Sequence, residues 1–205
     1  MANLPLLSIL TFLPLIGLPF IIIGKLINSE NYEIISKYIA LFVSLIAFII
    51  SLIILYNFDI STSNFQFNEH IPIMNGLMTY RMGIDGISIL FILLSTFLTP
   101  ICIIASWNII NDRVDYYMCS FLILETLMIG TFCALDIVLF YLFFESVLIP
   151  MFVIIGVWGG ERRVYSAFKF FLYTLLGSVL MLVAIIYIVL ISVSYTHLRA
   201  HETLS

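Results

Sequence analysis

The sequence contains few charged residues. Only 10% of its 205 residues are Asp, Glu, Lys or Arg, whereas about a quarter are charged in a typical soluble domain. The 8 Lys and Arg are outnumbered by 12 Asp and Glu, so the chain lacks the basic surface that nucleic-acid binding requires. The composition therefore excludes an ordinary soluble protein and argues against nucleic acid as a partner.

Cysteines and cofactor motifs are also scarce. Cys102, Cys119 and Cys133 lie in apolar segments without CxxC or Cys/His spacing, so we expect neither a disulfide framework nor a metal site. The sequence has no GxGxxG motif after a predicted strand, no Walker loop, no nucleophile elbow and no intramembrane histidine pair. We expect this chain to bind no nucleotide, redox cofactor or metal.

Long apolar segments make up most of the chain. Hydrophobic residues account for 63% of it, and a spanning helix needs about 20 consecutive apolar residues. We therefore predict an all-α, polytopic transmembrane helix bundle, in which residues 1–191 form a single domain. About six spanning helices are expected, near residues 4–23, 38–58, 86–110, 116–135, 137–158 and 168–190. Pro100 and Pro150 lie inside two of these spans, where each should bend its helix.

Two polar segments interrupt this pattern. Residues 59–88 form the longest connection, which we expect to be a solvated loop that ends with Asp85 in the cap region of the third span. His70 lies in this loop without clustered partners, which argues against a metal or proton-transfer role. The polar segment 192–205, SVSYTHLRAHETLS, follows the sixth span, and we interpret it as a foreign or artefactual tail.

The distribution of Lys and Arg predicts the orientation. The connections after the second and fourth spans contain only Arg81, and those after the first, third and fifth contain Lys25, Lys37, Arg113, Arg162, Arg163 and Lys169. Positively charged connections remain on the cytoplasmic or matrix side of a membrane. We therefore place the N-terminus on the periplasmic or intermembrane side.

Glu125 and Glu145 lie inside apolar spans, where an ionised, unpaired carboxylate costs several kcal/mol. Both are about ten residues from the turn at Asp136, and therefore roughly 15 Å from the same membrane face. Burial, and a second carboxylate nearby, would favour protonation of one group and suit it to a proton relay. The alternative is that each glutamate only makes a structural hydrogen bond between helices.

Lys169 is a third candidate for the relay. It lies only six residues after Arg163, and therefore shallower in the membrane than Glu145. It either extends to the membrane interface or faces the bundle and provides positive charge to the carboxylates.

Two segments carry a resemblance to a known family. They are GIDGISILFILLSTFLTPICIIASW, from Gly83, and the region from FFES at residues 143–146 to GVWGGERR at residues 156–163. Over about residues 1–190 the sequence resembles the amino-terminal part of chain M of bacterial respiratory complex I, NADH:quinone oxidoreductase, or its mitochondrial counterpart, chain 4. The resemblance implies a fragment of an antiporter-like fold of about fourteen helices. We expect the native gene to continue past Leu190 with further spans.

The resemblance also implies a function. It indicates a proton-translocating subunit of the membrane arm, which is part of an enzyme but contains no redox active site of its own. Glu145 falls on the family's essential glutamate of the fifth helix, which works there with a lysine on the seventh. NADH, flavin, iron–sulfur clusters and quinone would be bound by partner subunits, and the sequence does not indicate that this chain contacts quinone. The expected partners are other membrane-arm subunits and the lipid bilayer.

The resemblance implies a bacterial inner membrane, with the mitochondrial inner membrane as the alternative. Two other functions remain open. The chain could belong to a multisubunit sodium/proton antiporter or a membrane-bound hydrogenase, although the GVWGGERR block favours complex I. It could instead be a membrane scaffold that translocates nothing.

Overall fold

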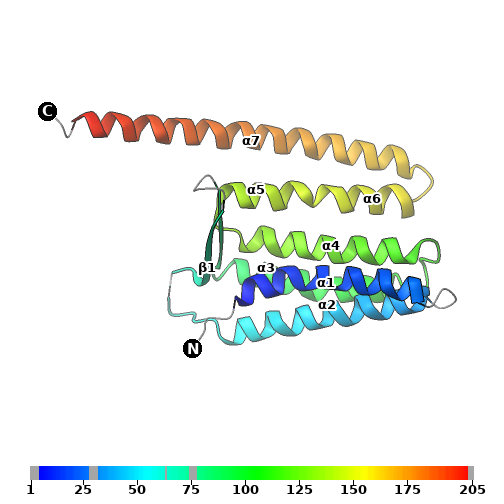
Figure 1. Ribbon diagram of the computed structural model, residues 1–205. Helices are drawn as coiled ribbons and strands as arrows, with labels where there is room; N and C mark the ends of the chain where they lie inside the picture. Colours follow the sequence, from blue (N-terminus) through cyan, green and yellow to red (C-terminus); the bar gives the residue numbers. More distant parts are fainter. Residues whose placement is uncertain (1–4, 28–31, 63, 74–77, 203–205) are drawn as a thin grey trace.

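A computed structural model describes residues 5–27, 32–62, 64–73 and 78–202. The elements are, in order, α1 (Leu6–Ile27), α2 (Tyr32–Tyr56), β1 (Gln66–Ile73), β2 (Met78–Ile84), α3 (Ser88–Ala105), α4 (Val114–Cys133), α5 (Ile137–Ser146), α6 (Leu148–Trp158) and α7 (Arg163–Glu202). The helices lie side by side (Figure 1). In the described part of the chain, six helical segments are long and apolar enough to cross a membrane, with α5 and α6 together forming one of them. The predicted polytopic helical bundle is confirmed.

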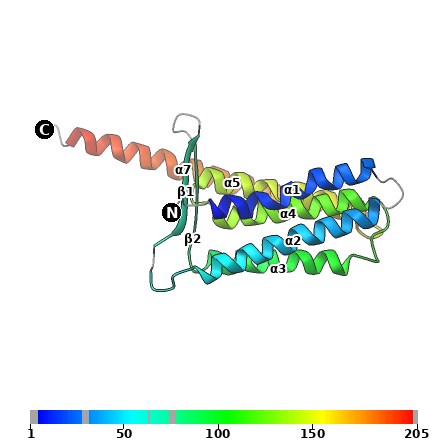
Figure 2. The same ribbon diagram turned by 60° about the horizontal axis from the view of Figure 1, so that its bottom comes forward.

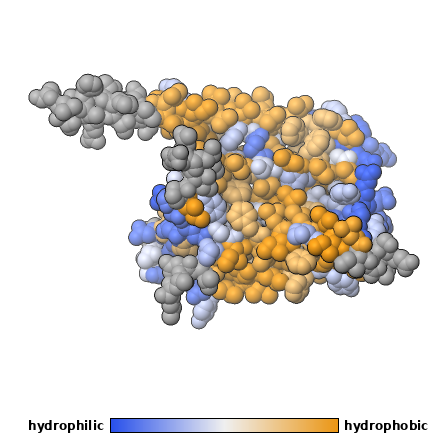
Figure 3. All heavy atoms as spheres, viewed as in Figure 1, coloured by the Kyte–Doolittle hydropathy of each residue, from blue (hydrophilic) through white to orange (hydrophobic). Residues whose placement is uncertain are grey.

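Helix α4 lies at the centre of the bundle. It contacts α1, α2, α3, α5 and α6, whereas α7 lies at the outside and packs mainly on α6 (Figure 1). A band of apolar side chains covers the length of the helices, and hydrophilic residues gather at the two ends (Figure 3). An apolar band between two polar ends is the surface that a lipid bilayer requires. Helices suit the bilayer as well, because they satisfy their backbone hydrogen bonds internally.

Pro150 interrupts the fifth span. Proline has no N–H, so the carbonyl of Ser146, four residues earlier, cannot receive the usual helical hydrogen bond. The helix is broken at Val147, which separates α5 from α6. The expected distortion is therefore found at this position. Around Pro100, by contrast, α3 continues without a break from Ser88 to Ala105.

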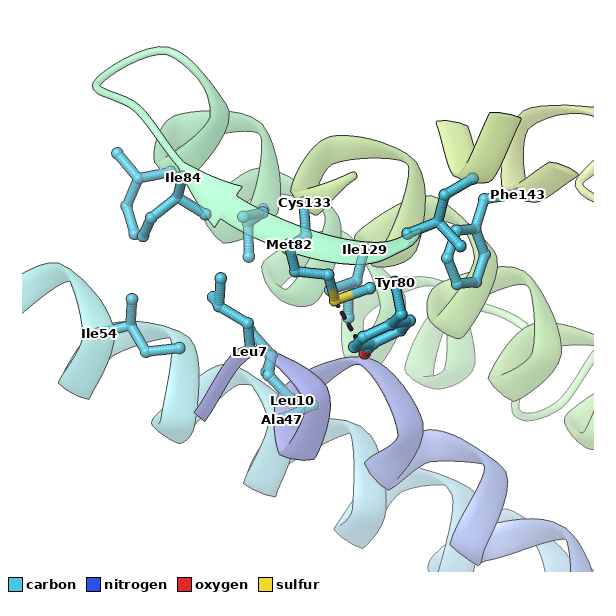
Figure 4. Close-up of a cluster of buried hydrophobic side chains, with 13 residues drawn as sticks. Leu7, Leu10, Ala47, Ile54, Tyr80, Met82, Ile84, Ile129, Cys133 and Phe143 are labelled. Carbon is cyan, nitrogen blue, oxygen red and sulfur yellow. Dashed lines mark hydrogen bonds between the residues drawn. The ribbon is translucent and has the colours of Figure 1, made fainter. Parts of the chain in front are cut away.

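The connection between α2 and α3 contains an antiparallel β-hairpin, so the expectation of a plain solvated loop was wrong. Alternate residues of β2, Tyr80, Met82 and Ile84, are buried in an apolar cluster (Figure 4). Successive side chains in a strand point to opposite faces, so His70 and Arg81, which pair with each other across the strands, lie outside this cluster. The hairpin crosses one end of the bundle (Figure 2).

Hydrogen bonds attach β1 to the start of α1. One carboxylate oxygen of Glu69 accepts from the Leu7 amide at 2.8 Å, and the other accepts from the Ser8 amide at 3.1 Å. The Ser8 hydroxyl also bonds Glu69, and lies 2.7 Å from the Tyr80 hydroxyl. Glu69 thus satisfies amides at the beginning of α1 that have no partner within the helix.

Two aspartates bond the first turns of helices at the same end. Asp85 accepts hydrogen bonds from the amides of Ile87 and Ser88, as expected for a residue in the cap region of α3. Asp136 bonds the amides of Val138 and Leu139 at the start of α5. Partial burial raises the pKa of the Asp136 carboxyl, but hydrogen bonds from the Thr79 hydroxyl and these amides outweigh burial and lower it below its ordinary value.

Several charges assigned to connections lie inside helices. Lys25 is in the last turn of α1, Lys37 is in α2, and Lys169 is in α7. A lysine can lie near the end of a spanning helix because its stem stays in apolar surroundings while its ammonium reaches water or a polar partner. A charged residue therefore does not mark the end of a helix. The backbone of α7 continues to Glu202, through most of the expected tail 192–205. The foreign origin of that tail stays a prediction.

Close packing of Gly130 against Phe143 fixes the contact between α4 and α5. A Cβ atom at Gly130 would lie only 2.6 Å from the ring of Phe143. We expect Gly130→Ala to lower the free energy of unfolding by about 1–3 kcal/mol through overpacking, measured by denaturant titration of the full-length protein in mixed micelles. Gly177→Ala is the matched control, because a Cβ at Gly177 meets no atom within 4 Å. Equal stability of the two variants would contradict this packing.

Candidate functional site

Glu125 is buried inside the bundle. Its residue is only 1% exposed, and neither carboxylate oxygen has a hydrogen-bond partner among the described residues. The adjacent Thr126 hydroxyl likewise has no partner there. Such groups are costly to bury without a proton or water. The site can therefore hold a proton on the carboxyl group or order water beside it.

Glu125 points away from α5. At about 100° per residue, it lies about 60° around α4 from Leu122 and about 140° from Gly130. The Leu122 side chain reaches Gly17 of α1, and Gly130 receives Phe143 of α5. Glu125 therefore lies on the side of α4 nearer α1 than α5.

Glu145 lies on the opposite side of α5 from α4. It follows Phe143 by two residues, which is about 200° around a helix, and Phe143 packs on Gly130 of α4. Helix α7 packs on this other side, with α5 and α6 between it and α4 (Figure 1). Glu145 is thus turned towards α7. One of its carboxylate oxygens, Oε2, is buried without a partner in the described structure.

The two glutamates lie at similar depths but are not brought together. Helices α4 and α5 are consecutive and antiparallel, with Gly130 level with Phe143. Glu125 is five residues before Gly130 and Glu145 two residues after Phe143, so their depths differ by about 4.5 Å. Their side chains point to opposite sides of the α4 and α5 pair. The prediction of a relay through both carboxylates therefore requires intervening groups or water.

Lys169 lies on the outward face of α7. It is nine residues from Ser178, a separation of about 180° around the helix, and Ser178 is one of the buried residues of α7. Lys169 is exposed, with its ammonium 6.0 Å from the centre of the Tyr165 ring. Within the described residues it forms no ion pair with Glu145. The structure does not pair Lys169 with either carboxylate among the described residues, and its extension to the membrane interface stays a prediction.

The sequence analysis missed an ion pair at the basic end of the bundle. Lys25 of α1 bonds Asp115 of α4 with an N–O distance of 2.7 Å. The Asp115 side chain is 9% exposed and that of Lys25 is 43% exposed. The ring centres of Tyr32 and Tyr116 also lie near the Lys25 ammonium, at 5.5 and 5.1 Å. An acidic residue in the first turn of a helix was a visible signal, but nothing local identified its partner.

Lys37 has a similar role nearby. It is 7% exposed, and its ammonium donates to the backbone carbonyl of Trp107 at 2.6 Å. The Trp107 ring in turn contacts Tyr38 edge to face at 5.2 Å. Lys25 thus joins α1 to the start of α4, and Lys37 joins α2 to the connection between α3 and α4.

Comparison with known proteins identifies the family. Residues 9–134 match the family described as the amino terminus of NADH-ubiquinone oxidoreductase chain 4. The chain belongs to this family. Residues 134–202 match the transmembrane family of NADH:quinone oxidoreductase and Mrp antiporters. The boundary between the two matches falls in the turn between α4 and α5, so the elements from α1 to α4 and the helices from α5 onward match different family models.

Individual relatives agree with this assignment. The chain is 51% identical to NADH-quinone oxidoreductase subunit M of Rhodobacter capsulatus over 88% of its length. It is 44% identical to subunit M of Rickettsia prowazekii over 92% of its length, and 46% identical to NADH-ubiquinone oxidoreductase chain 4 of Mycosarcoma maydis over 89%. These matches cover 35%, 38% and 37% of the respective relatives. The chain thus spans little more than a third of the length of these relatives.

We expect the Lys25 and Asp115 pair to stabilise the contact between α1 and α4. Lys25→Met and Asp115→Asn should show a small favourable coupling energy in a double-mutant cycle, because solvent partly screens the charge of Lys25. The cycle is measured by denaturant titration of the full-length protein in micelles. Lys169→Met combined with Asp115→Asn is the control and should be additive. Additivity in both cycles would mean that the ion pair contributes nothing.

Proposed function

We propose that the full-length protein containing this chain is a proton-translocating subunit in the membrane arm of respiratory NADH:quinone oxidoreductase. Membership of the chain 4 family supports this proposal. The observation that carries it further is the presence of Glu125 and Glu145 inside spanning helices, where both carboxylate oxygens of Glu125 and Oε2 of Glu145 are buried without partners in the described structure. Such groups can take up and release protons without redox chemistry in this chain.

Glu145 is the main proton carrier in this proposal. Its buried Oε2 atom is the place where a proton would be held, on the side of α5 turned towards α7. Glu125 is a second carrier on the other side of α4, reached through water or residues between them. Lys169 is the weaker candidate, because it pairs with neither glutamate among the described residues.

The proposal includes partners that carry the electron transfer. We infer that NADH, flavin, iron–sulfur clusters and quinone are bound by other subunits, and that this chain contacts neighbouring membrane-arm subunits and lipid. The membrane is a bacterial inner membrane, with the mitochondrial inner membrane as the alternative. The N-terminus lies on the periplasmic or intermembrane side, because Lys25, Lys37 and Arg113 gather at the opposite end.

Two alternatives remain. The second family match includes Mrp antiporters, which supports a subunit of a sodium/proton antiporter, or of the related membrane-bound hydrogenase, as the second candidate. The scaffold hypothesis requires the buried glutamates to bond neighbouring helices. Glu125 makes no such bond among the described residues, and this favours proton transfer.

Replacing Glu145 by glutamine tests the function directly. An amide can keep a hydrogen bond but cannot ionise, so Glu145→Gln should nearly abolish proton-coupled quinone reductase turnover in the assembled complex. Proton uptake and NADH oxidation are measured together in proteoliposomes. Assembly is checked on native gels.

Two further variants serve as controls. Glu125→Gln should lower turnover less than Glu145→Gln does, and Lys169→Ala should lower it least, because no carboxylate pairs with Lys169 among the described residues. Normal proton pumping by an assembled Glu145→Gln complex would refute the relay. A changed dependence of activity on sodium would instead favour the antiporter alternative.

Accessibility labelling tests the orientation. Single cysteines at Asn111 and Asn68, in a protein without other reactive cysteines, should be labelled from opposite sides of the membrane. We expect Asn111→Cys to react only from the cytoplasmic or matrix side, because it lies at the basic end. Reaction of both from one side would overturn the proposed topology.

A further inference from the structure

A polar cavity lies at the basic end of the bundle, away from Glu125 and Glu145. Its volume is about 670 Å³. Residues 109–113 of the connection between α3 and α4 form one wall, and residues 156–158 at the end of α6 together with Arg163 form the other. No residue of the proposed proton relay lines it.

Hydrogen bonds hold both walls of the cavity in place. The Trp158 indole donates to the Asp112 carbonyl at 2.8 Å, which joins α6 to the connection between α3 and α4. The Arg163 guanidinium donates to the Val157 carbonyl at 2.7 Å, near the end of α6. The Trp158 ring also packs edge to face on Tyr117, with 5.1 Å between ring centres. The cavity is therefore formed in advance of any ligand.

Two arginines give the cavity its positive charge. Arg163 uses one donor on Val157, and a guanidinium has five N–H donors, so others remain for a ligand. Arg113 is exposed, and its guanidinium forms no hydrogen bond or ion pair among the described residues. Its backbone is in the left-handed region, with φ 52°. The Asp112 carboxylate opposes one of the two charges, which leaves the lining with a net positive charge.

Arginine pairs bind phosphate groups well because the guanidinium fork matches two phosphate oxygens. Basic cavities between transmembrane helices at the positively charged membrane face bind anionic lipid headgroups. Tryptophan is enriched at the level of the headgroups, and Trp158 lines the same cavity as both arginines. The cavity thus has the charge, donors and membrane level that suit a phosphate ester.

We propose that the cavity between Arg113 and Arg163 binds the phosphate group of an anionic phospholipid. Both guanidinium groups contact the phosphate oxygens, and the Trp158 ring lies against the glycerol region. The same donors would accept free inorganic phosphate, so the experiment must distinguish these two sources. The inference does not depend on proton transfer through Glu145.

The test uses the intact complex in nanodiscs of phosphatidylcholine that contain photo-crosslinking phosphatidylglycerol. Peptide mass spectrometry should locate the crosslinks in residues 109–113 and 156–163. The double variant Arg113→Ala/Arg163→Ala should reduce this labelling about tenfold, which corresponds to about 1.4 kcal/mol. Arg162→Ala is the matched control, because Arg162 is an exposed neighbour of equal charge that does not line the cavity.

The outcomes separate the two ligand sources. Labelling that persists in added inorganic phosphate supports the lipid, whereas displacement by phosphate alone shows that free phosphate is the ligand and overturns the lipid assignment. Equal labelling of the wild type and the double variant overturns the site itself. Arg113→Lys/Arg163→Lys keeps both charges but loses both guanidinium forks, so it should retain only part of the labelling, and native gels verify assembly of every variant.

Discussion

The contact between Phe143 and Gly130 determines how the second half of the chain is oriented. Glycine is required at this point because the Phe143 ring occupies the space of a Cβ atom. The contact holds α5 against the central helix α4 and sets the rotation of α5 about its axis. Glu145 is consequently turned towards α7, while Glu125 remains on the other side of α4. The direction in which Glu145 faces, and its separation from Glu125, therefore follow from this contact.

The spanning helices could be predicted from the sequence because apolar segments of sufficient length have few alternatives in a bilayer. The two glutamates inside the spans were visible for the same reason, since a glutamate within such a segment is rare. The neighbouring helix towards which each glutamate points was not predictable. Helical periodicity relates residues within one helix, but only a contact such as that of Phe143 with Gly130 tells which neighbour each face meets.

The hairpin and the Lys25 and Asp115 pair were missed for different reasons. The alternation of Tyr80, Met82 and Ile84 is a strand pattern, but it is short and lies among polar residues that indicated a loop. Lys25 and Asp115 are 90 residues apart, so local sequence could not associate them. Both features join distant segments at the ends of the bundle, where hydropathy alone carries little information.

The break at Val147 divides the fifth span into two parts with different attachments. Helix α5 is anchored to α4 through Phe143, and α6 is tied to the α3–α4 connection through Trp158. The Ser146 carbonyl cannot receive its helical hydrogen bond at this junction, because Pro150 has no N–H. The upper and lower parts of this span are therefore held in the bundle by separate contacts, one to each side of the break.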